Sequence, residues 1–158
     1  MLFRSVGKND IGKSTVLEAL DIFFNDGKGS VKLDKEDINK ANLAAGDDCI
    51  EISVEFEDLP ASIVIDATNE TTLADEHLLT EAGTLRVIKR YQNAGKEKVF
   101  ISAHHPTAPG CSELLLKKNS DLKKLLEDQG LECQDKTRNA ELRKAIWNGQ
   151  GSLELQSI

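Results

Sequence analysis

The stretch VGKNDIGKSTVLEALDIFFN, residues 6–25, contains the pattern G-x-x-x-x-G-K-[ST] with an amphipathic helix directly behind it. Glycines in this pattern let the backbone bend, so that successive N–H groups converge on phosphate oxygens. The following helix adds its unpaired N-terminal amides and the positive end of its dipole. The stretch therefore predicts a loop that binds the phosphates of a nucleotide.

Each residue type in the pattern has an expected role. Gly7 and Gly12 supply the backbone freedom, and Lys13 would neutralise the β- and γ-phosphates of ATP. Ser14 would offer its hydroxyl to Mg²⁺, which makes it the expected metal ligand. The competing interpretation is a surface Gly/Lys turn that caps a helix without binding anything.

Composition sets the broad class of the protein. The 158 residues are enough for one ordinary domain, and 39% hydrophobic with 30% charged residues argues against disorder throughout. A formal net charge of −7 argues against a surface built wholly for nucleic acid, although a local basic patch stays open. The sequence contains no long apolar run and its first residues, MLFRSVGKND, do not resemble a signal peptide. We expect a cytoplasmic protein whose three cysteines, at positions 49, 111 and 133, are free thiols.

The middle of the chain predicts antiparallel strands. Apolar and acidic residues alternate over residues 50–57, which is typical of a strand with one face in water. Residues 84–92 and 96–102 flank the turn NAG and predict a β-hairpin. The helix at 13–25 is expected to lay Val16, Leu20 and Phe24 against this sheet.

The remaining elements are mainly helical. We expect a short helix at 34–42 capped by Asp34, and another near 73–79. Beyond Pro106 the pattern predicts helices at 112–118, at 121–129 with Ser120 as N-cap, and at 136–147. The predicted fold class is α/β (α+β): a phosphate loop with its helix, an antiparallel strand-rich middle and a helical C-terminal part. The domain boundary is expected near residue 106, between a lobe at 1–106 that contains the phosphate loop and a helical segment at 107–158.

The sequence resembles the amino-terminal ATPase lobe of OLD-like (overcoming-lysogenization-defect) and RecF-like ABC-type ATPases of the AAA family. The resemblance is carried by Asn9, by the GKST core at 12–15 and by the LEALDIFF helix. IEISVEFEDLP, DATNETTLADEHLL and NAELRKAIW also look like that group. The resemblance implies an incomplete P-loop NTPase lobe that binds ATP and Mg²⁺, with DNA and a second copy as partners of the full-length form. The residues that the resemblance and the motif together assign to the nucleotide are Gly7, Asn9, Asp10, Ile11, Gly12, Lys13, Ser14 and Thr15.

The chain departs from that group in several motifs. An acidic Walker B strand, an LSxG-like signature segment and a switch histidine do not occur in the sequence. The nearest candidate, IVID at 63–66, is interpreted as an ordinary strand end. LFRS joins VGKND directly, where the group has an intervening hairpin. We therefore expect a fragment or a truncated relative that binds Mg·ATP but scarcely hydrolyses it, and no catalytic residue is assigned.

Two other functions stay open at this point. One is a non-catalytic interaction module built on a truncated P-loop, and the other is a small-molecule kinase. Basic residues crowd the predicted hairpin and would either contact DNA or pair with the glutamates of residues 51–57. His104 and His105 are interpreted as part of a polar loop rather than as metal ligands. The basic residues are Arg86, Lys89, Arg90, Lys96 and Lys98.

Overall fold

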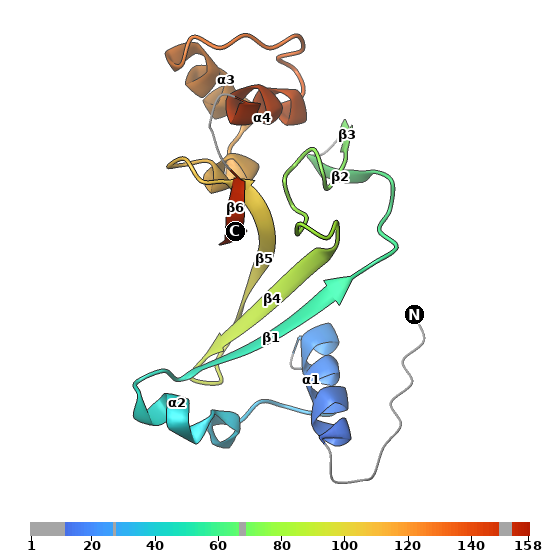
Figure 1. The fold of residues 1–158 in the computed structure, drawn as a ribbon, viewed down its shortest axis with the longest axis vertical. Helices are drawn as coiled ribbons and strands as arrows, with labels where there is room; N and C mark the ends of the chain where they lie inside the picture. Colours follow the sequence, from blue (N-terminus) through green and yellow to red (C-terminus); the bar gives the residue numbers. More distant parts are fainter. Residues whose placement is uncertain (1–11, 27, 67–68, 149–152) are drawn as a thin grey trace. The chain divides into compact units, whose positions relative to one another are not determined.

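A computed structural model describes residues 12–26, 28–66, 69–148 and 153–158 of the chain, and the side chain of Lys13 lies outside the description. Figure 1 labels the helices and strands. The helices are α1 (Lys13–Asn25), α2 (Lys40–Ala44), α3 (Asn119–Asp128) and α4 (Asn139–Asn148), with short 3-10 helices at Lys35–Asp37 and Ser112–Leu116. The strands are β1 (Cys49–Phe56), β2 (Ile63–Asp66), β3 (Asn69–Thr71), β4 (Leu85–Gln92), β5 (Glu97–Pro106) and β6 (Leu153–Ser157).

The chain forms two compact units. Unit 1 contains the described residues up to Ser53 together with Ile88–Val99, and unit 2 contains Val54–Val87 with the described residues from Phe100 onward. Each of the strands β1, β4 and β5 contributes residues to both units. Among the described helices, none combines the length and the apolar character that crossing a membrane requires.

The predicted antiparallel sheet is confirmed. The strand order is β1-β4-β5-β6, and β5 pairs with β6 in an antiparallel register. Strands β1 and β4 are antiparallel: Glu51 near the start of β1 pairs with Arg90 near the end of β4, and Glu55 near the end of β1 pairs with Arg86 near the start of β4. Strands β2 and β3 form a separate antiparallel pair. Neither β3 nor β6 was predicted, since each is short, with three and five residues.

The turn between β4 and β5 is the predicted hairpin. Asn93 and Ala94 have φ angles of 52° and 53°, the left-handed values that a two-residue hairpin turn requires at both central positions. The Gly95 N–H donates to the Gln92 carbonyl at 2.9 Å and closes the turn. A Cβ added to Gly95 would lie 2.9 Å from that same carbonyl oxygen, so a side chain does not fit there. The turn chemistry of the NAG sequence thus explains the hairpin.

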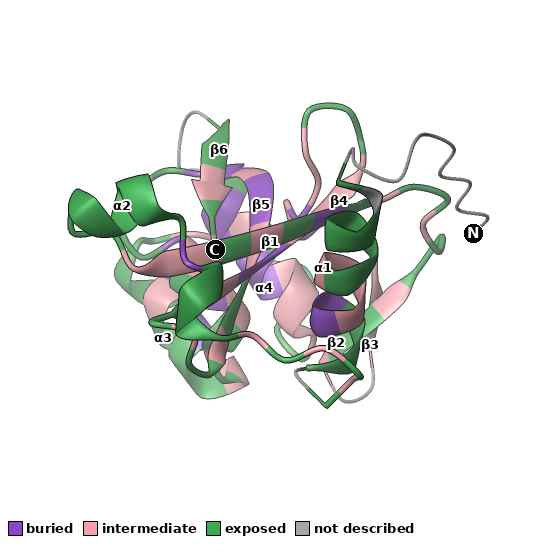
Figure 2. Cartoon of the chain, turned by 90° about the horizontal axis from the view of Figure 1, so that it is seen from below, coloured by how far each residue is buried: buried purple, intermediate pink, exposed green. Residues whose placement is uncertain are grey.

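Helix α1 has its predicted bounds, but the prediction of its buried face is wrong. Val16 and Phe24 are 60% and 51% exposed, whereas Ile22 and Phe23 are buried. Figure 2 shows this as a short purple stretch on a largely green α1. Apolar residues occur on more than one side of this helix, so spacing alone could not choose the buried side.

Several predicted helices have different bounds or types. The 34–42 helix is two elements: Asp34 and Asp37 form a capping box around one 3-10 turn, and Asn39 then caps α2. Residues 73–77 form turns instead of the helix expected near 73–79. The 3-10 helix Ser112–Leu116 replaces the helix expected at 112–118, and α4 begins at Asn139 rather than 136. Helix α3 has Lys118 at its N-cap, not Ser120, because the helix begins two residues earlier than its capping signal suggested.

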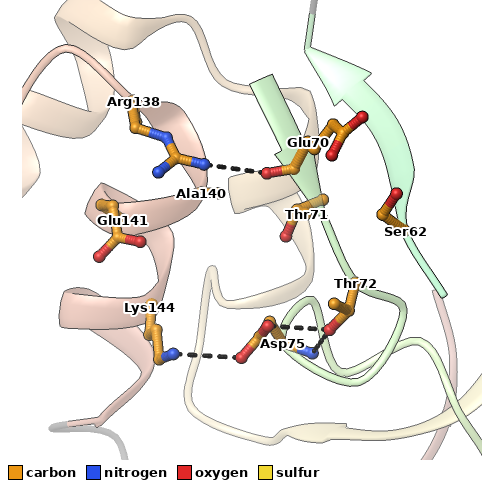
Figure 3. Close-up of a pocket in the computed structure, with 9 residues that line it drawn as sticks. All are labelled: Ser62, Glu70, Thr71, Thr72, Asp75, Arg138, Ala140, Glu141 and Lys144. Carbon is orange, nitrogen blue, oxygen red and sulfur yellow. Dashed lines mark hydrogen bonds and ion pairs between the residues drawn. The ribbon is translucent and has the colours of Figure 1, made fainter.

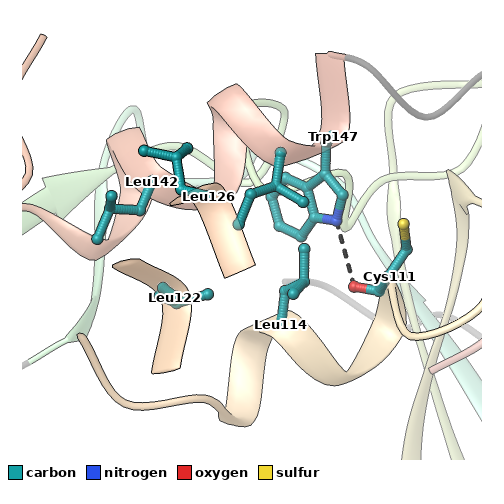
Figure 4. Close-up of a cluster of buried hydrophobic side chains, with 7 residues drawn as sticks. Cys111, Leu114, Leu122, Leu126, Leu142 and Trp147 are labelled. Carbon is teal, nitrogen blue, oxygen red and sulfur yellow. Dashed lines mark hydrogen bonds between the residues drawn. The ribbon is translucent and has the colours of Figure 1, made fainter. Parts of the chain in front are cut away.

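The hydrophobic core of unit 2 lies between α3 and α4. Leu122 and Leu126 on α3 meet Leu142 and Trp147 on α4, as Figure 4 shows. The indole N–H of Trp147 donates to the carbonyl of Cys111 at 3.2 Å, which satisfies the buried donor. Cys49, Cys111 and Cys133 are free thiols, as predicted.

Candidate functional site

Gly12 adopts a backbone conformation that favours glycine. It is the N-cap of α1 with φ 73° and ψ 12°, in the left-handed region that glycine adopts without strain. A Cβ at this position would meet nothing within 4 Å, so the requirement is conformational and not one of space. The Gly12 carbonyl accepts the first helical hydrogen bond, from Val16 N–H at 3.2 Å.

Ser14 and Thr15 lie in the first turn of α1 and are exposed. The first amides of a helix have no partner within the helix, and no acidic side chain occupies this first turn. No carboxylate of this turn therefore offsets the positive end of the helix dipole, and both hydroxyls are exposed. The structure thus brings Gly12, Ser14 and Thr15 together. The predicted residues Gly7, Asn9, Asp10 and Ile11, and the side chain of Lys13, lie outside the described part.

The other end of α1 is held by Lys89 of β4, a residue whose role the sequence interpretation missed. The Lys89 ammonium donates to the carbonyl oxygen of Phe23 at 2.7 Å and to the carboxylate of Asp26, and it lies 4.9 Å from the centre of the Phe23 ring. The hydrogen bond from Lys89, followed by its charge, lowers the pKa of Asp26. The signal was present in the strand: Lys89 is two positions from both Val87 and Tyr91, so the three side chains share one face of β4, and Tyr91 is buried.

Two of the basic residues of the hairpin form cross-strand pairs with β1. Arg86 forms an ion pair with Glu55 at 2.9 Å, and Arg90 forms one with Glu51 at 2.8 Å. The hydrogen bond from Thr84, followed by those from Arg86, lowers the pKa of Glu55. The interpretation of this face as paired, solvated charge is confirmed for these residues.

The histidine interpretation is corrected. His104 and His105 belong to β5 rather than to a polar loop, and His105 is fully buried. Its ring nitrogens lie 3.1 Å from the carbonyl oxygen of His77 and 3.4 Å from that of Cys111. Within the described ranges, no group of His, Cys, Asp or Glu residues could hold a metal ion.

Asp66 ends strand β2 and serves a buried ion-pair network. Arg143 has no exposed surface; it donates to both carboxylate oxygens of Glu76 at 2.7 Å and to Asp66 at 2.9 Å. Asn139 donates to the other oxygen of Asp66 at 3.0 Å. Burial alone would raise the pKa of Asp66, but these hydrogen bonds and the Arg143 charge lower it overall. The interpretation of IVID as an ordinary strand end therefore fits the structure.

A polar cavity of about 340 Å³ lies between α4 and the β2–β3 region of unit 2 (Figure 3). Arg138 donates to the carbonyl oxygen of Glu70 at 3.0 Å, and Lys144 pairs with Asp75 at 3.1 Å, so both cations on its wall already have protein partners. Glu141 lies on α4 between these two contacts, as the figure shows. Acidic and basic groups are mixed here, and the cavity shows no preference for an anionic ligand such as a nucleotide.

Comparison with known proteins adds the family. Residues 5–153 match the AAA ATPase domain, a range that begins before the phosphate-loop pattern and includes most of both units. No curated protein and no solved structure matches the chain. The matched range covers nearly the whole sequence, and it includes the left-handed Gly12 and the exposed first turn of α1. The chain belongs to the AAA ATPase domain family, and nucleotide binding is the function that this membership implies.

Proposed function

We propose that this chain is the ATP-binding portion of an OLD-like, RecF-like ABC-type ATPase, and that it binds Mg·ATP at the N-terminal end of α1. The observation that supports this most directly is Gly12, which caps α1 in a left-handed conformation immediately before Lys13, Ser14 and Thr15. A glycine in that position directs the loop so that its amides and the first amides of α1 face one ligand.

The proposed contacts follow from the chemistry of these residues. Lys13 neutralises the β- and γ-phosphates, Ser14 binds Mg²⁺ through its hydroxyl, and backbone amides of the 7–12 loop hold phosphate oxygens. Hydrogen bonds to charged groups contribute roughly 1.5–3 kcal/mol each, so several together support binding without a deep pocket for the base. Gly7, Asn9, Asp10, Ile11 and Thr15 complete the proposed site.

Titration calorimetry with Mg·ATP tests this proposal. Lys13→Ala should abolish measurable binding, because it removes the only side-chain cation of the pattern GKST. Lys124→Ala is the matched control: it makes the same change of charge at an exposed helical lysine of unit 2 and should bind as the wild type does. Equal affinity of the wild type and Lys13→Ala would reject the assignment.

The wider role that we propose is in DNA metabolism or anti-phage defence, with DNA and a second copy of the protein as partners of the full-length form. In this proposal residues 1–106 are the ATPase lobe and residues 107–158 begin a helical insertion. The packing of α3 on α4 around their own hydrophobic cluster supports the second part. Sequencing the native gene on both sides of these codons tests the role: an acidic Walker B strand and a signature segment in frame are expected.

A further inference from the structure

Helix α1 is attached to unit 1 through its C-terminal half. The described side chains of its first turns, Ser14–Glu18, are exposed, and burial becomes complete only at Ile22 and Phe23. The Asp21 carboxylate accepts the Val31 N–H at 2.9 Å, which ties this same half of α1 to the loop that follows it. The end that carries the phosphate-binding residues is thus the free end of the helix among the described contacts.

Lys89 connects this attached half to the sheet. Its side chain is 11% exposed, and its ammonium contacts the Phe23 carbonyl, the Asp26 carboxylate and the face of the Phe23 ring. The last carbonyls of a helix have no partner within the helix and carry the negative end of the dipole. A cation from β4 at this place fixes the helix end by charge, hydrogen bonding and ring contact together.

A helix is a stiff rod, so a change at one end moves the other. At 1.5 Å per residue, about 15 Å separate Phe23 from Lys13 along the axis, and a tilt of about 10° at the attached end would move Lys13 by roughly 2–3 Å. Binding groups must be held within about 0.5 Å of their productive geometry. A loosened C-terminal anchor therefore matters at the phosphate end.

We propose that Lys89 is a positioning residue for ATP binding: by holding the C-terminal end of α1 on β4, it sets the place of Lys13 and Ser14 at the other end. This inference rests on the proposed function. It assigns to a buried strand lysine an effect on a ligand that it does not contact.

The test compares variants of the full chain by Mg·ATP calorimetry and by amide hydrogen exchange of α1. Lys89→Met keeps a long side chain but removes the charge, and it should weaken ATP binding at least tenfold and speed exchange in α1. Lys89→Arg keeps a cation and should stay within about threefold of the wild-type affinity. Ile88→Ala, at a buried neighbour in the same strand, is the control for general loss of stability and should leave ATP affinity unchanged in the folded protein.

Asp26→Asn provides a variant that should fold, since the Asp26 side chain is more than half exposed. It removes one of the two polar contacts of Lys89 and should weaken ATP binding to an intermediate degree. Wild-type affinity in both Lys89→Met and Asp26→Asn would overturn the inference, as would an equal loss in Ile88→Ala. If the wild type itself binds no ATP, the proposed function fails, and unchanged α1 exchange in Lys89→Met separately rejects the positioning role.

Discussion

Arg143 connects helix α4 to two other segments of unit 2 through ion pairs. It is buried without exposed surface and pairs with Glu76, which is 1% exposed, and with Asp66. The two opposite charges of Arg143 and Glu76 are tolerated here because they pair through two hydrogen bonds of 2.7 Å, from Nε and Nη2 of Arg143. Removing one partner of such a pair leaves the other charged and buried, which costs far more than the pair itself contributes.

Arg143→Met should therefore lower the free energy of unfolding by about 3–5 kcal/mol in urea denaturation. Lys144→Met is the matched control on the same helix, because Lys144 forms an exposed pair with Asp75. Exposed pairs contribute only about 0–1 kcal/mol, so the control should stay within about 1 kcal/mol of the wild type. Similar losses in both variants would show that burial of the Arg143 network does not decide its contribution.

The same network predicts a dependence of stability on pH. The pKa of Asp66 is lower in the folded protein than its ordinary value of about 3.9, since the bonds from Arg143 and Asn139 outweigh the effect of burial. A lowered folded pKa gives stability that is present above the unfolded pKa and is lost as pH falls through the folded pKa. The difference in unfolding free energy between wild type and Asp66→Asn should thus be largest above about pH 5 and shrink below about pH 4. A difference that stays constant over this range would contradict the assignment.

At the scale of elements, the β4–β5 turn has two different requirements at neighbouring positions: a left-handed backbone at one and the absence of a side chain at the next. Ala94 holds a φ of 53° with a side chain, whereas Gly95 has ordinary φ but stands against the Gln92 carbonyl. The two positions therefore predict opposite effects of exchanging alanine and glycine.

Ala94→Gly should stabilise the protein by up to about 1 kcal/mol. The left-handed conformation costs alanine roughly 1–2 kcal/mol and glycine almost nothing, but glycine also raises the entropy of the unfolded chain, which offsets part of this gain. The substitution also creates Asn-Gly, the favoured pair for this turn. Gly95→Ala should destabilise the protein, since its Cβ would lie 2.9 Å from a backbone oxygen. Chemical denaturation of both variants measures this, and a destabilising Ala94→Gly would show that the turn differs in solution.

At the scale of the whole molecule, the proposed function requires an acidic chain to bind an anionic ligand. The formal net charge is −7, so general electrostatics oppose ATP, and the proposed binding would depend on the local positive end of α1 and on Lys13. A ligand that binds only the folded state raises its stability by RT ln(1 + [L]/Kd), where [L] is the concentration of free ligand.

Mg·ATP at a hundredfold excess over its Kd should add about 2.7 kcal/mol of stability. For a chain of this size that corresponds to a rise in Tm of roughly 5–10 °C in a thermal melt. Lys13→Ala should show no such rise at the same ATP concentration. A rise of equal size in Lys13→Ala would point to general anion effects instead of the proposed site.

Local patterns in the sequence were sufficient for the elements whose causes are local. The GKST core with its helix, the alternation of residues 50–57 and the NAG turn each depend on neighbours within a few positions, and α1, β1 and the β4–β5 hairpin formed as predicted. At Gly12 the sequence indicated only backbone freedom, and the structure shows the left-handed N-cap that uses it.

Only the tertiary structure decided what depends on distant partners. It turned Ile22 and Phe23 inward rather than Val16 and Phe24, buried His105 in β5, and added β6 beside β5. It also paired Lys89 with Asp26 and Arg143 with Glu76, across 63 and 67 positions of sequence. Periodicity states that a face is apolar or that a charge is present, but which face is buried and which charge it meets depend on the packing of the whole chain.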